Sequence, residues 1–130
     1  MRELADKIHA AMGDTRLLEL MDAAFNNLPD AVMHPRNTYA ELVRGNVESI
    51  PVSEMVDRVA AMPLVPYPPG IPAMMPGERA SRKKRAIVDY LLGLQEFDGR
   101  FPGFEHDTHG VEIERDSSGN PIYMTYVLKE

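Results

Sequence analysis

The chain contains the stretch Val65-Pro66-Tyr67-Pro68-Pro69-Gly70-Ile71-Pro72-Ala73-Met74-Met75-Pro76-Gly77-Glu78. It has five prolines and two glycines in fourteen residues, and most of its other side chains are apolar. Helices and central strands do not hold this many prolines, and flexible linkers are rarely this apolar. We therefore predict an ordered loop over residues 63–78, with a preset backbone and side chains intended for burial.

Residues 1–28 are predicted to form a helical lead-in of two helices, because their apolar residues recur at helical spacing. Gly13 is expected to end the first helix and Asp14 to cap the second, which would run over residues 15–27 until Pro29 stops it. The stripe expected to be buried on the second helix is Leu17, Leu18, Met21, Ala24, Phe25 and Leu28.

Shorter elements are expected between the lead-in and the loop. A helix capped by Asn37 or Thr38 would end at Gly45. Residues 47–52 alternate like a strand, and its final proline indicates an edge strand or a strand end. A further helix is predicted after Ser53, and a short strand at residues 64–65.

Two stronger elements follow the proline-rich loop. Residues 81–97 have a wide apolar face and predict a helix that opens with the cations of residues 82–85. These cations oppose the helix dipole, so either they have acidic neighbours or they form a solvated first turn. After a Gly-, Pro- and His-rich loop over residues 98–110, alternation on both sides of the turn 116–120 predicts a β-hairpin over residues 111–128.

This order of elements predicts an α+β fold, with helices packed on a small mixed or antiparallel sheet and a C-terminal β-hairpin. A chain of 130 residues fits one domain, 1–130. The loops 63–78 and 98–110 would expose many apolar and aromatic side chains for a domain of this size. This much exposed apolar surface is unlike an isolated domain.

Composition narrows the possible functions. The net charge of −6 disfavours nucleic-acid binding, and the chain has no cysteine for disulfides, thiolate catalysis or zinc ligation. No apolar run reaches the length of a membrane span, and the N-terminus lacks the apolar core of a signal peptide. We therefore expect a cytoplasmic protein with neither a nucleic-acid nor a membrane partner.

Candidate catalytic chemistry is sparse. His106, His109 and a carboxylate could bind a divalent ion, but their spacing matches no defined motif, and a structural loop is the alternative. No nucleophile motif or phosphate-binding glycine loop occurs. Lys83 and Lys84 lie in a like-charged run but in no evident pocket. We therefore assign no catalytic, cofactor-binding or metal residue.

Tyr67-Pro68-Pro69-Gly70-Ile71-Pro72 with Met75-Pro76-Gly77-Glu78, and Phe101-Pro102-Gly103-Phe104-Glu105 with Asp107 and His109-Gly110, resemble two blocks of one family. That family is the C-terminal domain of the bacterial ornithine/lysine/arginine decarboxylases. Residues 38–45 are also similar, so the resemblance spans residues 17–129.

The resemblance implies a parent chain several times longer, whose fold-type I domain binds pyridoxal phosphate through a lysine that follows a histidine. No lysine of this chain follows a histidine. The chain is therefore expected to hold no cofactor and to be inactive alone. Its partners would be the cofactor-binding domain of the parent and other copies of that parent. The alternative is a free-standing binding or regulatory module that shares the domain.

The resemblance also suggests a role for the loop. It implies that Tyr67, Ile71, Met74 and Met75 form an interface with the larger remainder of the parent, and not a binding site for a small molecule. We hypothesise that Tyr67, Pro68, Pro69, Gly70, Pro72 and Glu78 lie at the domain interface near the substrate entrance, where Glu78 would attract a cationic substrate. The other possibility is that Glu78 caps the following helix or pairs with Arg79 or Arg82. Phe104-Glu105-His106 and Met74-Met75 favour arginine over lysine or ornithine.

Overall fold

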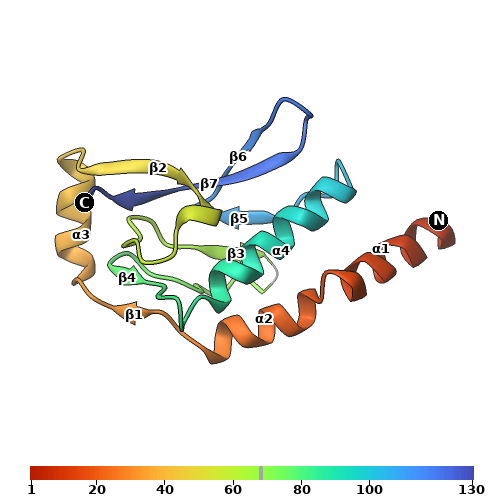
Figure 1. Cartoon of the computed structure of the whole chain (residues 1–130), viewed down its shortest axis with the longest axis horizontal. Coiled ribbons are helices and arrows are strands. Elements are labelled where there is room, and N and C mark those ends of the chain that lie inside the picture. Colours follow the sequence, from red (N-terminus) through yellow and green to blue (C-terminus); the bar gives the residue numbers. More distant parts are fainter. Residues whose placement is uncertain (68) are drawn as a thin grey trace.

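The computed structural model describes residues 1–67 and 69–130 (Figure 1). Within these residues, no helix has the length and apolar character needed to cross a bilayer. The helices are α1 (Arg2–Asp14), α2 (Leu17–Asn26), α3 (Pro35–Val43) and α4 (Ala86–Arg100), with a 3-10 turn η1 (Val52–Glu54). The strands are β1 (Asp30–Ala31), β2 (Val47–Pro51), β3 (Val65–Tyr67), β4 (Glu78–Arg79), β5 (Asp107–His109), β6 (Glu112–Arg115) and β7 (Pro121–Leu128).

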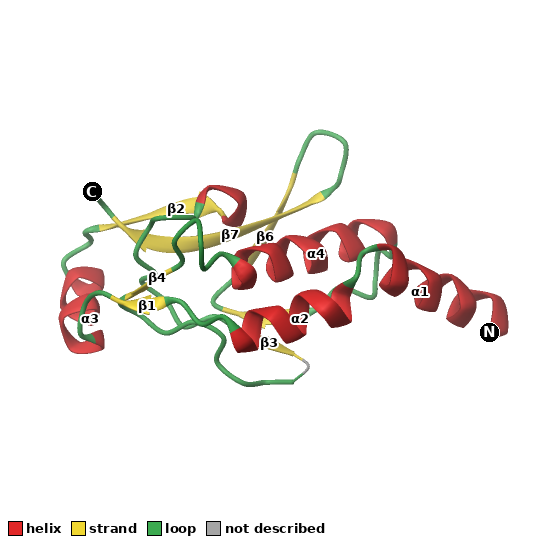
Figure 2. Cartoon of the chain, turned by 60° about the horizontal axis from the view of Figure 1, so that its bottom comes forward, coloured by secondary structure: helices red, strands yellow, loops and turns green. Residues whose placement is uncertain are grey.

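The fold has three layers, with α4 between a sheet and α2 (Figures 1 and 2). The sheet is antiparallel in the order β2-β7-β6, and β2 is an edge strand that ends in proline, as predicted. Along β7, the alternate positions Pro121, Tyr123, Thr125 and Val127 are buried, as is the final residue Leu128, so one face of the strand points to the core. The predicted α+β class and the C-terminal hairpin are confirmed.

Helix α4 packs closely on α2 because Gly93 leaves room for it. A Cβ at Gly93 would lie 2.8 Å from Leu20 Cδ1 and 3.1 Å from Leu17 Cδ2. Ala24 and Leu17 are buried in this contact, whereas Leu18 and Leu28 are exposed, contrary to the predicted stripe. The buried side of α2 is therefore narrower than its run of apolar residues.

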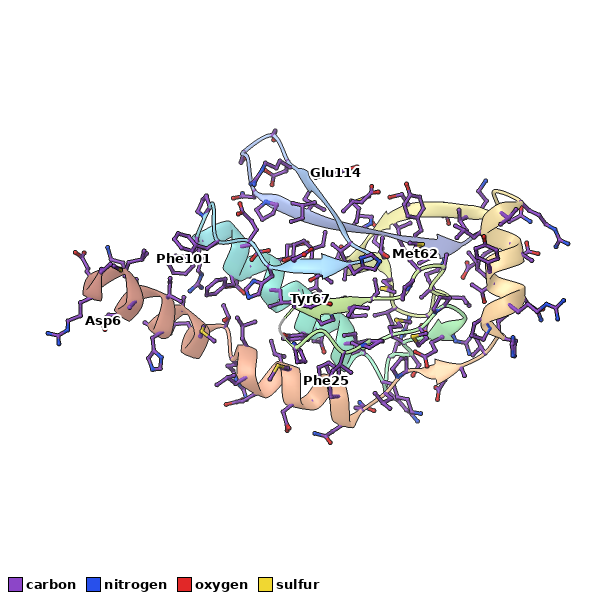
Figure 3. The ribbon with its side chains drawn as sticks, turned by 180° about the vertical axis from the view of Figure 1, so that it is seen from behind. Asp6, Phe25, Met62, Tyr67, Phe101 and Glu114 are labelled. Atoms are coloured by element: carbon purple, nitrogen blue, oxygen red, sulfur yellow. The ribbon has the colours of Figure 1, made fainter. Side chains whose placement is uncertain are left out.

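The junction between the first two helices differs from the prediction. Helix α1 continues through Gly13 and Asp14, and Thr15 closes it with its N–H and Oγ1 both donating to the Ala11 carbonyl, at 2.9 and 2.7 Å. Arg16 then adopts φ 55°, a left-handed conformation that ends the helix and redirects the chain. Helix α1 points away from the other elements, with Asp6 near its free end (Figure 3).

Two other predicted helix starts are wrong. His34, not Asn37 or Thr38, caps α3: its Nδ1 accepts from the Arg36 N–H at 3.2 Å, and Pro35 takes the first helical position, where no N–H is needed. Helix α4 begins at Ala86 rather than at residue 81 and ends at Arg100. Arg82, Lys83 and Lys84 thus precede the helix, and Arg85, at its N-cap, lies 2.9 Å from Asp89 in the first turn.

No helix forms after Ser53, where one was predicted. The 3-10 turn buries Val52 and Met55, and Asp57 then takes φ 67°. The next residues pair with distant strands, Val59 with Arg79 and Ala60 with Val127. Tertiary pairing overrides the local helical pattern in this segment.

Candidate interdomain surface

The two loops that the sequence singled out come together in the structure. Strand β3, inside the proline-rich segment, pairs antiparallel with β5, inside the 98–110 loop, with Tyr67 opposite Asp107 and Val65 opposite His109. A Cβ at Gly110 would lie 2.0 Å from the Pro63 carbonyl oxygen, so only glycine permits this approach of the two backbones. The segments therefore form one unit.

The proline-rich loop is held at its base and exposed at its tip. At the base, the Leu64 N–H donates to the Met74 carbonyl and the Ala73 N–H to the Leu64 carbonyl, both at 2.9 Å. Leu64, Ala73 and Met74 are buried, which corrects the prediction that Met74 belongs to the interface. The loop therefore places exposed apolar side chains on a buried, hydrogen-bonded base.

The tip carries several of the predicted interface residues. Tyr67 and Ile71 are 54% and 55% exposed, and Met75 is also exposed. The Tyr67 ring covers Gly70, where a Cβ would lie 2.7 Å from Cε1. Pro69 and Pro72 are exposed as well. Pro68 lies outside the described residues.

Glu78 and Tyr67 lie on different strand pairs. Glu78 belongs to β4, which pairs with β1, whereas Tyr67 belongs to β3, which pairs with β5. Its Oε2 accepts from the Met75 N–H at 2.8 Å and closes a local turn. It does not cap α4, which starts eight residues later, and within the described residues no ion pair joins it to Arg79 or Arg82.

A buried polar cluster supports the second loop, and the sequence did not reveal it. Asp98 is 1% exposed, and its Oδ1 accepts from the His106 N–H at 3.0 Å and lies 2.7 Å from the ring Nδ1. The Tyr123 hydroxyl donates to Oδ2. A T-shaped contact between the Phe97 and His106 rings completes the cluster. These residues come from α4, the loop and β7, so no local pattern could have joined them.

The cluster controls protonation of Tyr123. Burial, and secondarily the hydrogen bond to Asp98, raise the pKa of the Tyr123 hydroxyl far above its usual value.

Tyr90 and Glu105 also have shifted pKa values. Burial raises the pKa of Tyr90. At the rim, backbone N–H groups of the loop and then Arg115 lower the pKa of Glu105, whose Oε1 lies 3.1 Å from Arg115 Nη2. The loop is therefore held by a protonated tyrosine inside and an ionised carboxylate outside.

The residues considered for metal binding do not converge. His106 turns inward to Asp98, whereas His109 and Asp107 lie on the exposed face of β5. In the described part of the chain, no group of three or more His, Asp or Glu side chains could hold a metal ion. The contacts of the 98–110 loop therefore support a structural role and not a metal site.

The basic cluster before α4 has acidic neighbours. Lys84 Nζ lies 2.5 Å from Asp30, Arg85 Nε 2.9 Å from Asp89 and Arg82 Nε 3.7 Å from Asp57. The pair of Lys84 and Asp30 links the segment just before α4 to β1. Of the two alternatives for this cluster, the one with acidic neighbours therefore holds for Arg82, Lys84 and Arg85.

Comparison with known proteins agrees with this geometry. Residues 18–129 match the family described as the Orn/Lys/Arg decarboxylase, C-terminal domain. The chain belongs to this family. The lysine decarboxylase LdcA of Pseudomonas aeruginosa is 42% identical over all 130 residues, which make up 17% of that protein. The biodegradative arginine decarboxylase of Escherichia coli is 38% identical over 87% of this chain and 15% of its own length.

Solved structures of the family contain the same fold. The constitutive lysine decarboxylase of Escherichia coli superposes with a TM-score of 0.87 and 39% identity, covering 97% of this chain and 17% of that one. This chain thus spans about a sixth of the length of its relatives. In this Orn/Lys/Arg decarboxylase domain, the two sequence blocks form the paired unit of β3 and β5.

Proposed function

We propose that this domain is the C-terminal part of a longer decarboxylase of basic amino acids, and that the tip of its proline-rich loop packs on the cofactor-binding domain near the active-site entrance. The observation that supports this most is the loop itself, pinned at Leu64 and Met74 and apolar at its exposed tip. A preformed loop loses little conformational entropy on docking.

Pyridoxal phosphate would be bound by the rest of the parent. The chain has four lysines, of which Lys7, Lys83 and Lys129 are exposed and Lys84 is paired with Asp30. A lysine that binds the cofactor needs a desolvated site that lowers its pKa, so these residues do not fit that role. When bound, the cofactor draws electrons from the substrate as the carboxylate leaves. The domain's own contribution would be to shape and cover the entrance.

Lysine is the substrate that we propose for the parent. The chain is 42% identical to a lysine decarboxylase over its full length, against 38% over 87% for an arginine decarboxylase. This weighs against the arginine preference predicted from residues 104–106 and 74–75. Release of CO2 from lysine, arginine and ornithine by the parent enzyme tests the proposal, and no turnover of any of them would refute it. A cytoplasmic homo-oligomer belongs to the same proposal, and sedimentation of the parent tests its assembly.

Ile71→Asp tests the docking of the tip. Because Ile71 is exposed, the charge should leave the melting temperature of the isolated domain unchanged. In the parent it would place a carboxylate in an apolar contact, so kcat/KM should fall by about tenfold or more. Val43→Asp is the matched control, since Val43 is an exposed aliphatic residue on α3. Equal activity of the Ile71 variant and the wild type would contradict the docking.

Glu78→Gln tests whether this carboxylate attracts the substrate. The amide oxygen of glutamine can still accept from the Met75 N–H, so the turn should be preserved. Loss of one carboxylate near a cationic substrate should raise KM by about fivefold, equivalent to about 1 kcal/mol. Glu112→Gln, on exposed β6, is the control. An unchanged KM would remove Glu78 from the entrance and leave it as a turn residue.

A further inference from the structure

An apolar groove lies beside the proline-rich loop. Helices α1 and α2 contribute Met12, Leu18 and Met21, α4 contributes Tyr90 and Leu94, and the loop contributes Pro69. Its volume is about 210 Å³, enough for one or two large aliphatic side chains. Leu18 on its rim is 64% exposed, although it sits on a helix whose other side is in the core. An aliphatic side chain this exposed beside an apolar hollow is typical of a contact surface.

Two of the groove's lining residues carry polar groups, Tyr90 with its hydroxyl and His106 with its imidazole. Nδ1 of this ring lies 2.7 Å from Asp98, whose other oxygen accepts from Tyr123, so the ring is held in one orientation. With Nδ1 used in this pair, Nε2 is the ring nitrogen available to an occupant. The groove therefore fits an apolar segment that presents one hydrogen-bonding group.

Its position in the domain indicates where the occupant comes from. The groove lies where α1 meets α2, in the first segment of the domain, and α1 points away from the other elements (Figure 3). The family match is to a C-terminal domain, and relatives are about six times as long as this chain, so their remaining sequence precedes this region. A segment tethered through α1 would meet the groove at a high effective concentration, on the order of millimolar, unlike a separate protein.

We infer that this groove seats an apolar segment of the parent chain that precedes residue 1, with His106 as its polar contact. The inference rests on the proposed membership in a longer chain and adds a second contact surface, α2 with the 98–106 loop. The exposed tip residues Tyr67 and Ile71 neighbour Pro69 in the chain, so the two surfaces share one edge. The groove would set the orientation of this domain on the rest of the enzyme.

Thiol accessibility tests this inference, and the absence of native cysteines makes the isolated domain a clean reference. Leu18→Cys is introduced into both the domain and the parent, and maleimide labelling of the peptide containing position 18 is followed by mass spectrometry. Ser117→Cys, in the exposed hairpin turn, is the control. Thermal melts of the domain variants check that they fold.

The thiol introduced at position 18 should react as fast as the thiol at position 117 in the isolated domain and about tenfold or more slowly in the parent. Protection that persists when the parent is diluted to its monomer supports the inference. Equal rates in the parent would overturn it. Protection of this thiol that is lost on dilution, or that appears in the concentrated isolated domain, would mean that a second copy of the chain occupies the groove. Either result would also overturn the inference. Labelling requires no turnover, so an inactive parent in which position 18 is protected would refute only the proposed function.

Discussion

Tyr123→Phe removes the hydroxyl that donates to the buried carboxylate of Asp98, and its effect should differ between neutral and alkaline pH. At pH 7 the variant leaves Asp98 Oδ2 buried without this donor, while Oδ1 keeps both contacts with His106. An unsatisfied buried acceptor costs about 1–3 kcal/mol of unfolding free energy. The phenylalanine ring fills nearly the same space, so no cavity adds to this cost.

The alkaline effect follows from the raised pKa of Tyr123. An unfolded tyrosine ionises near pH 10, whereas the folded one stays protonated, so above that pH the unfolded state binds fewer protons. Stability from this group is complete below about pH 10, and above it the loss approaches about 1.4 kcal/mol per pH unit. The variant lacks this loss. The difference between wild type and variant should therefore shrink by about 1 kcal/mol between about pH 10 and 11.

Urea unfolding followed by circular dichroism at pH 7, 9, 10 and 11 measures both effects. Other groups that titrate in this range, including Tyr90, are present in both proteins and cancel in the difference. Tyr39→Phe is the control, because Tyr39 is 65% exposed on α3, and its change should stay within about 0.5 kcal/mol. A loss below about 0.5 kcal/mol at pH 7, with parallel pH profiles, would refute the hydrogen bond between Tyr123 and Asp98.

Two further predictions concern the fold and the proposed metal loop. Gly110→Ala forces a Cβ against the Pro63 carbonyl at φ +88° and should lower the unfolding free energy by more than about 3 kcal/mol. Gly119→Ala, at φ +82° with open space around it, is the control and should lower it by about 1 kcal/mol. Similar urea midpoints for the two variants would contradict the close approach of the backbones. Chelator should leave the thermal melt of the domain unchanged, because the histidines of the 98–110 loop do not converge with carboxylates on one site; a lowered melting temperature would revive the metal hypothesis.

Much of the fold could be predicted where the pattern was local and strong. The apolar face of α4 predicted its burial, and Ile87, Val88, Leu91 and Leu94 are indeed buried. The alternation of β7 and the Asp116–Asn120 turn predicted the hairpin, and the edge position of β2 was indicated by its last residue, Pro51. In each case a single period or turn signal spanned the element.

Most of the errors fall where distant residues compete with local preference. One error is local: Asp14 was expected to cap α2, but α1 continues through Asp14, and the Thr15 hydroxyl bonds back to Ala11. The other errors involve residues farther along the chain. The helix expected after Ser53 is absent because Val59 and Ala60 pair with strands from other parts of the chain. Met74 was expected at the surface of its loop but fills the core under Leu64.

The candidate site divides in the same way. The sequence alone determined that two blocks resembled one family and that Tyr67 and Ile71 would be exposed, because sequence motifs and apolar loops are local properties. Only the tertiary structure decided that β3 and β5 pair, that Glu78 lies on a different strand pair from Tyr67, and that Asp98, His106 and Tyr123 meet in a buried cluster. These contacts join segments up to tens of residues apart in the chain, and their formation depends on the packing of α4 between β7 and α2, which no local sequence pattern specifies.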